Sequence, residues 1–176
     1  MAINFSKLSV LIVEDNHSVL DLLSTILHSL GFGRIFKEEN GEDAYVTYMN
    51  RNPDIIITDW EMAPMNGIQL TKKIREDLQN PNRMIPIILL TGYSYHERVE
   101  EARDAGVTEF LVKPFSAEEL MARITHVINK PRDFLETEEF IGPDRRRRDD
   151  PSYKDEERRS DEPLEKLDPE EFWGDI

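Results

Sequence analysis

Apolar runs alternate with stretches of helical periodicity over the first 130 residues. Short runs of aliphatic and β-branched residues predict five strands, at 8–13, 34–37, 54–59, 86–91 and 109–113. After each run, apolar residues recur every three or four positions and predict five helices, at 18–30, 41–50, 67–78, 96–106 and 116–128. This alternation predicts an α/β domain whose parallel sheet is covered on both faces.

Residues at the segment ends support this assignment. Gly31 follows the first helix and is a C-cap signal. The pairs Ser94–Glu97 and Ser116–Glu119 have the spacing of capping boxes. Each cap contributes about 1 kcal/mol to helix stability.

The pattern changes near residue 131. Residues 131–176 hold 17 acidic and 9 basic side chains but 10 hydrophobic ones. Such a segment buries too little apolar surface to offset its chain entropy. We therefore expect a domain over residues 1–130 and a charged, largely irregular tail over residues 131–176.

Composition narrows the class of protein. The 176 residues carry a net charge of −14, and this field disfavours direct binding to nucleic acid. Cysteine is absent, which excludes disulfides and cysteine-ligated zinc. No apolar run is long enough to span a membrane, and the N-terminus lacks the features of a signal peptide, so we expect a cytoplasmic protein.

Residues that could carry out chemistry lie at the ends of the predicted strands. The sequence places Glu14 and Asp15 after the first strand, Asp59 at the end of the third, Thr91 at the end of the fourth and Lys113 at the end of the fifth. The carboxyl ends of parallel strands share one edge of a sheet, where ligands of such folds bind. We therefore expect the five side chains to meet there.

The residue types indicate phosphoryl chemistry. Close carboxylates need a cation, and oxygen ligands without histidine or cysteine favour Mg²⁺. Lys113 and Thr91 are suited to bind a phosphoryl oxygen, and Asp59 can supply the attacking oxygen.

These positions resemble the receiver domain of two-component response regulators. The resemblance spans about residues 7–130. It is carried by Glu14-Asp15, Asp59, the loop MAPMNG at 62–67, Thr91-Gly92 and Lys113-Pro114-Phe115.

The resemblance implies a flavodoxin-like, doubly wound sheet of strand order 2-1-3-4-5 with five helices. It further implies phosphorylation of Asp59, Mg²⁺ held by Glu14, Asp15, Asp59 and the backbone carbonyl of Glu61, and phosphoryl binding by Thr91 and Lys113. In this family a threonine, here Thr91, and an aromatic residue, here Phe110, act as the switch. The resemblance implies that on phosphorylation the threonine moves toward the phosphoryl group and the aromatic ring turns inward.

One position departs from the family pattern, which usually has M-P-x-M-x-G after the acceptor. Here Ala63 stands at the usual proline position and Pro64 follows it. This puts the shape of the loop and the lifetime of the phosphoryl group in question.

The function that we predict is that of a stand-alone phospho-accepting response regulator, not an enzyme with a separate substrate. Its phosphodonor would be a histidine kinase or a histidine phosphotransfer protein, and its target an unidentified protein. The face formed by residues 96–106, 109–113 and 116–128 is a candidate surface for homodimerisation. No contact with nucleic acid or membrane is expected.

Two alternatives stay open at the level of sequence. One is a phosphatase with an aspartyl-phosphate intermediate, although the stretch Asp59-Trp60-Glu61 lacks its second aspartate. The other is an interaction module that acts through residues 131–176 independently of phosphate. The apolar residues near the end of that segment, Trp173 among them, fit either docking on a partner or packing on the receiver itself.

Overall fold

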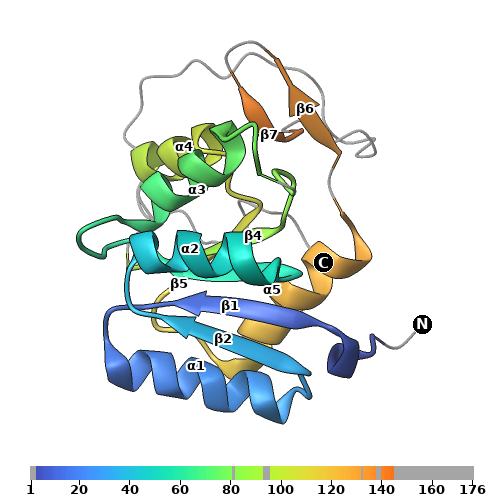
Figure 1. Cartoon of the computed structure of the whole chain (residues 1–176). Coiled ribbons are helices and arrows are strands. Elements are labelled where there is room, and N and C mark those ends of the chain that lie inside the picture. Colours follow the sequence, from blue (N-terminus) through green and yellow to red (C-terminus); the bar gives the residue numbers. More distant parts are fainter. Residues whose placement is uncertain (1–2, 81, 93–95, 132, 138–139, 145–176) are drawn as a thin grey trace.

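A five-stranded parallel sheet forms the centre of the molecule (Figure 1). This computed structural model describes residues 3–80, 82–92, 96–131, 133–137 and 140–144. The strands are β1 (Ser9–Val13), β2 (Arg34–Glu38), β3 (Ile55–Asp59), β4 (Ile87–Thr91) and β5 (Glu109–Val112). Their order in the sheet is β2-β1-β3-β4-β5, which confirms the flavodoxin-like topology expected from the sequence.

Five α-helices connect and follow the strands, as predicted. They are α1 (His17–Ser29), α2 (Gly41–Arg51), α3 (Gly67–Glu76), α4 (His96–Asp104) and α5 (Ala117–Asn129), preceded by one 3₁₀ turn, η1 (Phe5–Lys7). Every predicted strand and helix end lies within two residues of the observed one. None of the helices in the described part of the chain has both the length and the apolar character that a membrane span requires.

Helix caps explain several of these boundaries. Gly31, just after α1, has a φ of 87°, a conformation that glycine adopts without steric cost. Ser116 and Glu119 form the predicted capping box of α5 in both directions. The proposed box of Ser94 with Glu97 lies outside the described residues.

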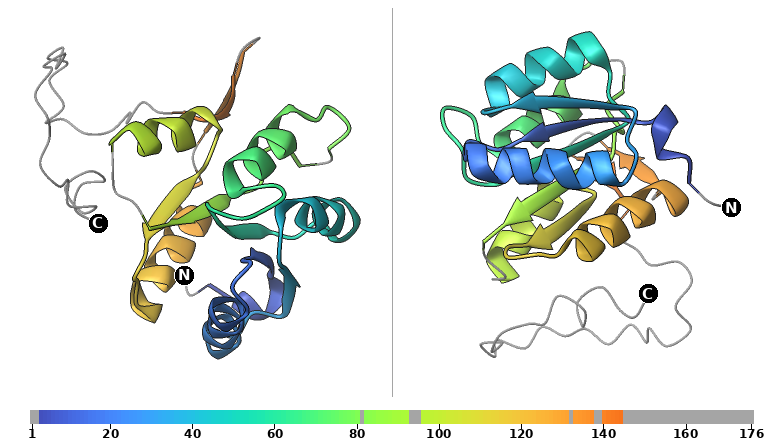
Figure 2. Two further views of the ribbon diagram at one scale, coloured as in Figure 1. Left: turned by 90° about the vertical axis from the view of Figure 1, so that its left-hand side faces the viewer. Right: turned by 90° about the horizontal axis from the view of Figure 1, so that it is seen from below.

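The helices cover the two faces of the sheet (Figure 2). One hydrophobic cluster joins α1 and α5 to one face, with Leu23 and Ile124 fully buried in it. A second joins α2 and α3 to the other face around Tyr48. A third packs α4 against the neighbouring strands, where Val99 and Phe110 share a cluster. Burial on both faces explains why β1, β3 and β4 are buried along their whole length.

An element that the sequence pattern did not predict follows α5. Two short antiparallel strands, β6 (Phe134–Glu136) and β7 (Ile141–Pro143), form a separate sheet beside α3 (Figure 1). Ile141 is buried there, whereas Glu136 is exposed. The first part of the predicted tail is therefore folded against the domain. The run Arg145–Arg148 and the apolar residues near the C-terminus lie outside the described residues.

Candidate functional site

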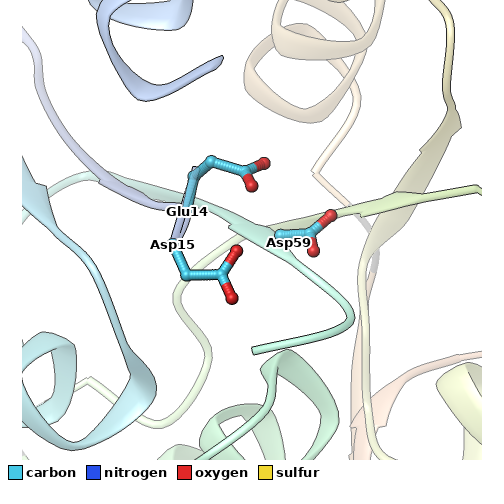
Figure 3. Close-up of side chains that lie close together, drawn as sticks. All are labelled: Glu14, Asp15 and Asp59. Atoms are coloured by element: carbon cyan, nitrogen blue, oxygen red, sulfur yellow. The ribbon is translucent and has the colours of Figure 1, made fainter. Parts of the chain in front are cut away.

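Three carboxylates meet at the carboxyl edge of the sheet. Glu14 and Asp15 follow β1, and Asp59 is the last residue of β3 (Figure 3). Because Val13 pairs with Thr58 in the parallel register, the next residue of each strand comes to the same level. One oxygen from each of the three side chains lies within 4.8 Å of the others. The predicted convergence of the acidic residues is confirmed.

Lys113 completes this cluster from the end of β5. Its Nζ lies 2.5 Å from Oδ1 of Asp59 and 2.8 Å from Oε2 of Glu14. Its backbone N–H donates to the carbonyl of Thr91, at 2.6 Å, and this bond continues the pairing of β4 with β5 beyond Val112. The ammonium therefore comes from the far side of β4 and bridges two acids on two other strands.

The same electrostatic arrangement shifts two pKa values. Burial raises the pKa of Glu14, which is 2% exposed; the bond from Lys113 offsets part of this and the negative charge of Asp59 adds to it. Burial by itself would lower the pKa of Lys113, but its hydrogen bonds to Asp59 and Glu14 outweigh that effect and raise it. Both shifts follow from burial combined with charged groups at close range.

Both carboxylate oxygens of Asp59 have defined partners. Oδ1 faces Lys113, and Oδ2 accepts a hydrogen bond of 3.1 Å from the backbone N–H of Glu61. The side chain is 10% exposed, so one small part of it remains accessible from solvent. This arrangement fixes the orientation of a reactive carboxylate and leaves an approach to it.

The loop after Asp59 is held at its far end by a close backbone approach. The N–H of Gly67 donates to the carbonyl of Trp60 at 3.1 Å. A Cβ at position 67 would lie 2.1 Å from the carbonyl oxygen of Asp59, so only glycine fits there. The peptide bond between Ala63 and Pro64 is cis. The far end of the loop that departs from the family pattern is thus hydrogen-bonded to the residue after the acceptor and lies directly against the acceptor's backbone.

Gly41 is a further support of this loop that sequence reasoning missed. Its N–H donates to the carbonyl of Met65 at 3.1 Å, and a Cβ on it would lie 2.7 Å from that oxygen. Asn40 caps α2 and places Gly41 at its first position. A glycine between a helix cap and an amphipathic segment was the available signal, but nothing in the sequence indicates its distant contact.

The other predicted residues take the following places. Thr91 is the last residue of β4 and is 3% exposed; it follows Leu90, which pairs with Asp59. Phe110 is 8% exposed and packs in one cluster with Trp60. The side chain of Glu61 is exposed, and its backbone carbonyl as a metal ligand stays a prediction.

The donor set fits a small hard cation. All three acidic groups offer oxygen, as Mg²⁺ prefers, and Asp15 is exposed while Glu14 and Asp59 are buried. When all three are ionised, Lys113 leaves two uncompensated negative charges, which match a divalent ion. One ligand open to solvent also fits an ion that retains several waters.

Comparisons with known proteins agree with this geometry. The family model described as the response regulator receiver domain matches residues 10–125. Chemotaxis protein CheY-3 of Vibrio cholerae is 30% identical over 129 residues, which cover 73% of this chain and 98% of the relative.

Two solved structures share the fold. The chemotaxis response regulator CheY4 of Vibrio cholerae has a TM-score of 0.63 and 30% identity, and the match covers 68% of this chain and 98% of that one. CheY in a CheX-CheY-BeF3-Mg²⁺ complex from Borrelia burgdorferi has a TM-score of 0.62 and 29% identity, with 69% and 89% covered. β6 and β7 lie beyond the end of the family match.

Proposed function

The chain belongs to the response regulator receiver domain family of two-component signalling, and we propose that Asp59 is the residue on which it accepts the phosphoryl group. The observation that carries this assignment is the position of Asp59, between the ammonium of Lys113 and the carboxylates of Glu14 and Asp15. Its Oδ1 faces the ammonium of Lys113 and its Oδ2 accepts from the backbone N–H of Glu61, so the carboxylate is held in one orientation.

The transfer would proceed from a phosphohistidine donor. The phosphorus–nitrogen bond breaks while a bond forms between phosphorus and one carboxylate oxygen of Asp59. The leaving nitrogen keeps the electron pair of the broken bond and takes up a proton from solvent. Lys113 moves its charge from the carboxylate to an oxygen of the transferred group, and the hydroxyl of Thr91 donates a hydrogen bond to another.

Glu14, Asp15, Asp59 and the carbonyl of Glu61 would hold Mg²⁺ beside the acceptor. When bound, the cation neutralises the acidic cluster and stabilises the negative charge of the phosphoryl oxygens. The protein acts here as an acceptor and not as a catalyst that turns over a separate substrate. The burial of Phe110 beside Trp60 supports the proposed switch, because a change at Asp59 has a short path through Trp60 to that ring.

The donor in this proposal is a histidine kinase or a histidine phosphotransfer protein, and the output is altered binding to a protein partner. The complex of CheX with CheY supports a protein as the partner, since it is formed by a relative of the same fold.

Phosphorylation by a small donor tests the assignment directly. With acetyl phosphate and Mg²⁺, we expect the wild-type chain to gain one hydroxylamine-labile phosphoryl group, detected by intact mass. Asp59→Asn should gain none, while Asp21→Asn, which alters an exposed aspartate on α1, should match the wild type. Full labelling of Asp59→Asn would show that another residue is the acceptor.

A further inference from the structure

The two-strand clamp, residues 134–136 and 141–143, is fastened to the domain by contacts of several kinds. Arg83 donates to a carboxylate oxygen of Glu136 at 2.7 Å. The ring of Phe134 lies against the guanidinium of Arg75, with 5.0 Å between the ring centroid and Cζ. These contacts join β6 to α3 and to the segment that follows α3, so the clamp is built onto the domain.

Glycine contacts fasten the second strand of the clamp. A Cβ on Gly142 would lie 2.9 Å from Cα of Gly106, and a Cβ on Gly106 would lie 2.8 Å from the carbonyl oxygen of Ile141. The two backbones therefore touch, which side chains at either position would prevent. Gly106, with a φ of 87°, forms the turn that ends α4 and leads into β5.

Arg75 joins the clamp to the turn at Gly106. The side chain extends from α3, and its Nε donates to the carbonyl of Gly106 at 3.0 Å while Nη1 donates to the carbonyl of Arg83 at 2.6 Å. Phe134 covers the guanidinium from the clamp side. One side chain thus connects α3, the end of α4, the segment before β4 and β6.

This connection places a cation in an unfavourable environment. Arg75 is 1% exposed, and burial lowers its pKa to about 9. Among the residues that the structure describes, it has no carboxylate partner, and its Nη2 makes no hydrogen bond. A buried guanidinium without a counter-ion favours a state in which water reaches it. Two effects therefore oppose each other in the closed clamp. Its apolar and ionic contacts favour closure, whereas the guanidinium of Arg75, which has no counter-ion among the described residues, favours opening.

The end of α4 also connects to the candidate site. Ala102 and Ala105 pack in one cluster with Phe110 and Trp60, and Trp60 directly follows Asp59. The clamp thus fixes one end of a continuous set of packed residues, and the acceptor stands at the other. A two-state change anywhere in such a set would affect both ends.

We propose that the β6–β7 clamp regulates the phosphoacceptor by holding α4 in the arrangement in which Phe110 is buried, so that closing the clamp favours the phosphorylated form. This rests on the proposed function, which assigns Asp59 and the switch. Since coupling is reciprocal, phosphorylation in turn tightens the clamp. The clamp lies outside the family match, so this regulation is a property of this chain beyond the shared receiver domain.

Beryllofluoride with Mg²⁺, as a mimic of the phosphoryl group, tests this coupling in the full chain. Its affinity can be measured by fluorine NMR, and opening of the clamp by hydrogen exchange at residues 140–144. We expect beryllofluoride to slow exchange at these residues in the wild type. Phe134→Ala, which uncovers Arg75, should weaken beryllofluoride binding by about fivefold or more, the lower end of ordinary allosteric coupling.

Leu135→Ala is the matched control, because it truncates the neighbouring half-buried residue of β6 without removing the ring on Arg75. It should weaken binding much less than Phe134→Ala. If Phe134→Ala does not fold, Glu136→Gln carries the test: it removes the negative charge that pairs with half-buried Arg83 and should weaken binding in the same direction.

The outcomes separate the two proposals. A wild-type chain that binds no beryllofluoride contradicts the proposed function and the coupling together. Normal binding by the wild type with unchanged affinity in the folded clamp variant, or with exchange at residues 140–144 that does not respond to beryllofluoride, overturns the clamp alone.

Discussion

Lys113 bridges Asp59 and Glu14, with its Nζ 2.5 Å from one carboxylate and 2.8 Å from the other. The two acids belong to β3 and to the end of β1, while the lysine follows β5. A single ammonium thus stabilises an edge where three acidic side chains gather. It also orients the carboxylate of Asp59 before any phosphoryl group is present, so this part of the site is preorganised.

Removing this ammonium should destabilise the fold. Lys113→Met leaves Asp59 and Glu14 close together without their shared cation, and we expect the free energy of unfolding without Mg²⁺ to fall by about 1–3 kcal/mol at pH 7. Urea unfolding followed by circular dichroism measures it. The control Lys37→Met removes an ion pair with exposed Asp21 and should change stability by less than about 0.5 kcal/mol. Equal losses of unfolding free energy in Lys113→Met and Lys37→Met would show that the partly buried position of Lys113 does not strengthen its ion pairs.

The alkaline limit of stability should depend on the same residue. The pKa of Lys113 is raised above its ordinary value of 10.5, so its contribution is fully present below that pH and is lost as the pH rises through the folded-state pKa. The difference in unfolding free energy between the wild type and Lys113→Met should therefore stay constant up to about pH 10 and then shrink. A difference that already disappears near neutral pH would contradict this.

Glu14 should destabilise the metal-free protein while it contributes to the metal site. Its raised pKa means that the ionised form carries a penalty at neutral pH, absent below the ordinary value of 4.5. Without Mg²⁺, Glu14→Gln should therefore raise the melting temperature at pH 7, and this gain should vanish in acid.

With Mg²⁺ present, the wild type should become more stable than Glu14→Gln. At ten times the dissociation constant, a bound ion stabilises the wild type by about 1.4 kcal/mol, and Glu14→Gln should lose most of this because one ligand is gone. Thermal unfolding with and without Mg²⁺ measures both effects. If Mg²⁺ stabilises Glu14→Gln as strongly as the wild type, Glu14 is not a ligand of the ion.

The pattern of the first 130 residues sufficed to predict the sheet and the place of its chemistry. β-branched runs buried on both faces are distinctive, and each ends close to a polar residue. The parallel connection then brings Asp59 and Lys113 to one edge irrespective of loop details. The loop geometry could not be predicted in this way, because the contact between Gly41 and Met65 joins segments with no shared pattern.

The clamp was not predictable because its stability comes from distant partners. β6 and β7 have three residues each, too few for a period, and they stand in a charged segment. Arg75 occurs in a helix that looks amphipathic, where arginine normally faces solvent. Its burial depends on backbone carbonyls of Gly106 and Arg83, and no side-chain pattern encodes these.

Gly67 should be essential to the shape of the acceptor loop. A Cβ at this position would lie 2.1 Å from the carbonyl oxygen of Asp59, so Gly67→Ala must displace that backbone. We expect a loss of about 1–3 kcal/mol in unfolding free energy together with slower phosphorylation by acetyl phosphate.

Gly92→Ala is the control for this change, because it lies at the same edge of the sheet and its added methyl group would meet nothing within 4 Å. It should alter stability by less than about 0.5 kcal/mol. If Gly67→Ala were equally harmless, the close approach to Asp59 would not constrain the loop.

Trp60 should report binding at the site, because it follows Asp59 directly and is 7% exposed in the cluster that holds Phe110. The chain has two tryptophans, so the experiment uses Trp173→Phe to leave Trp60 as the single tryptophan and follows its emission selectively. In this background we expect Mg²⁺ to change the fluorescence in a saturable manner. Adding Asp15→Asn should abolish the change by removing a ligand, while adding Asp21→Asn should preserve it. A flat titration in the Trp173→Phe protein would count against a cation beside Asp59.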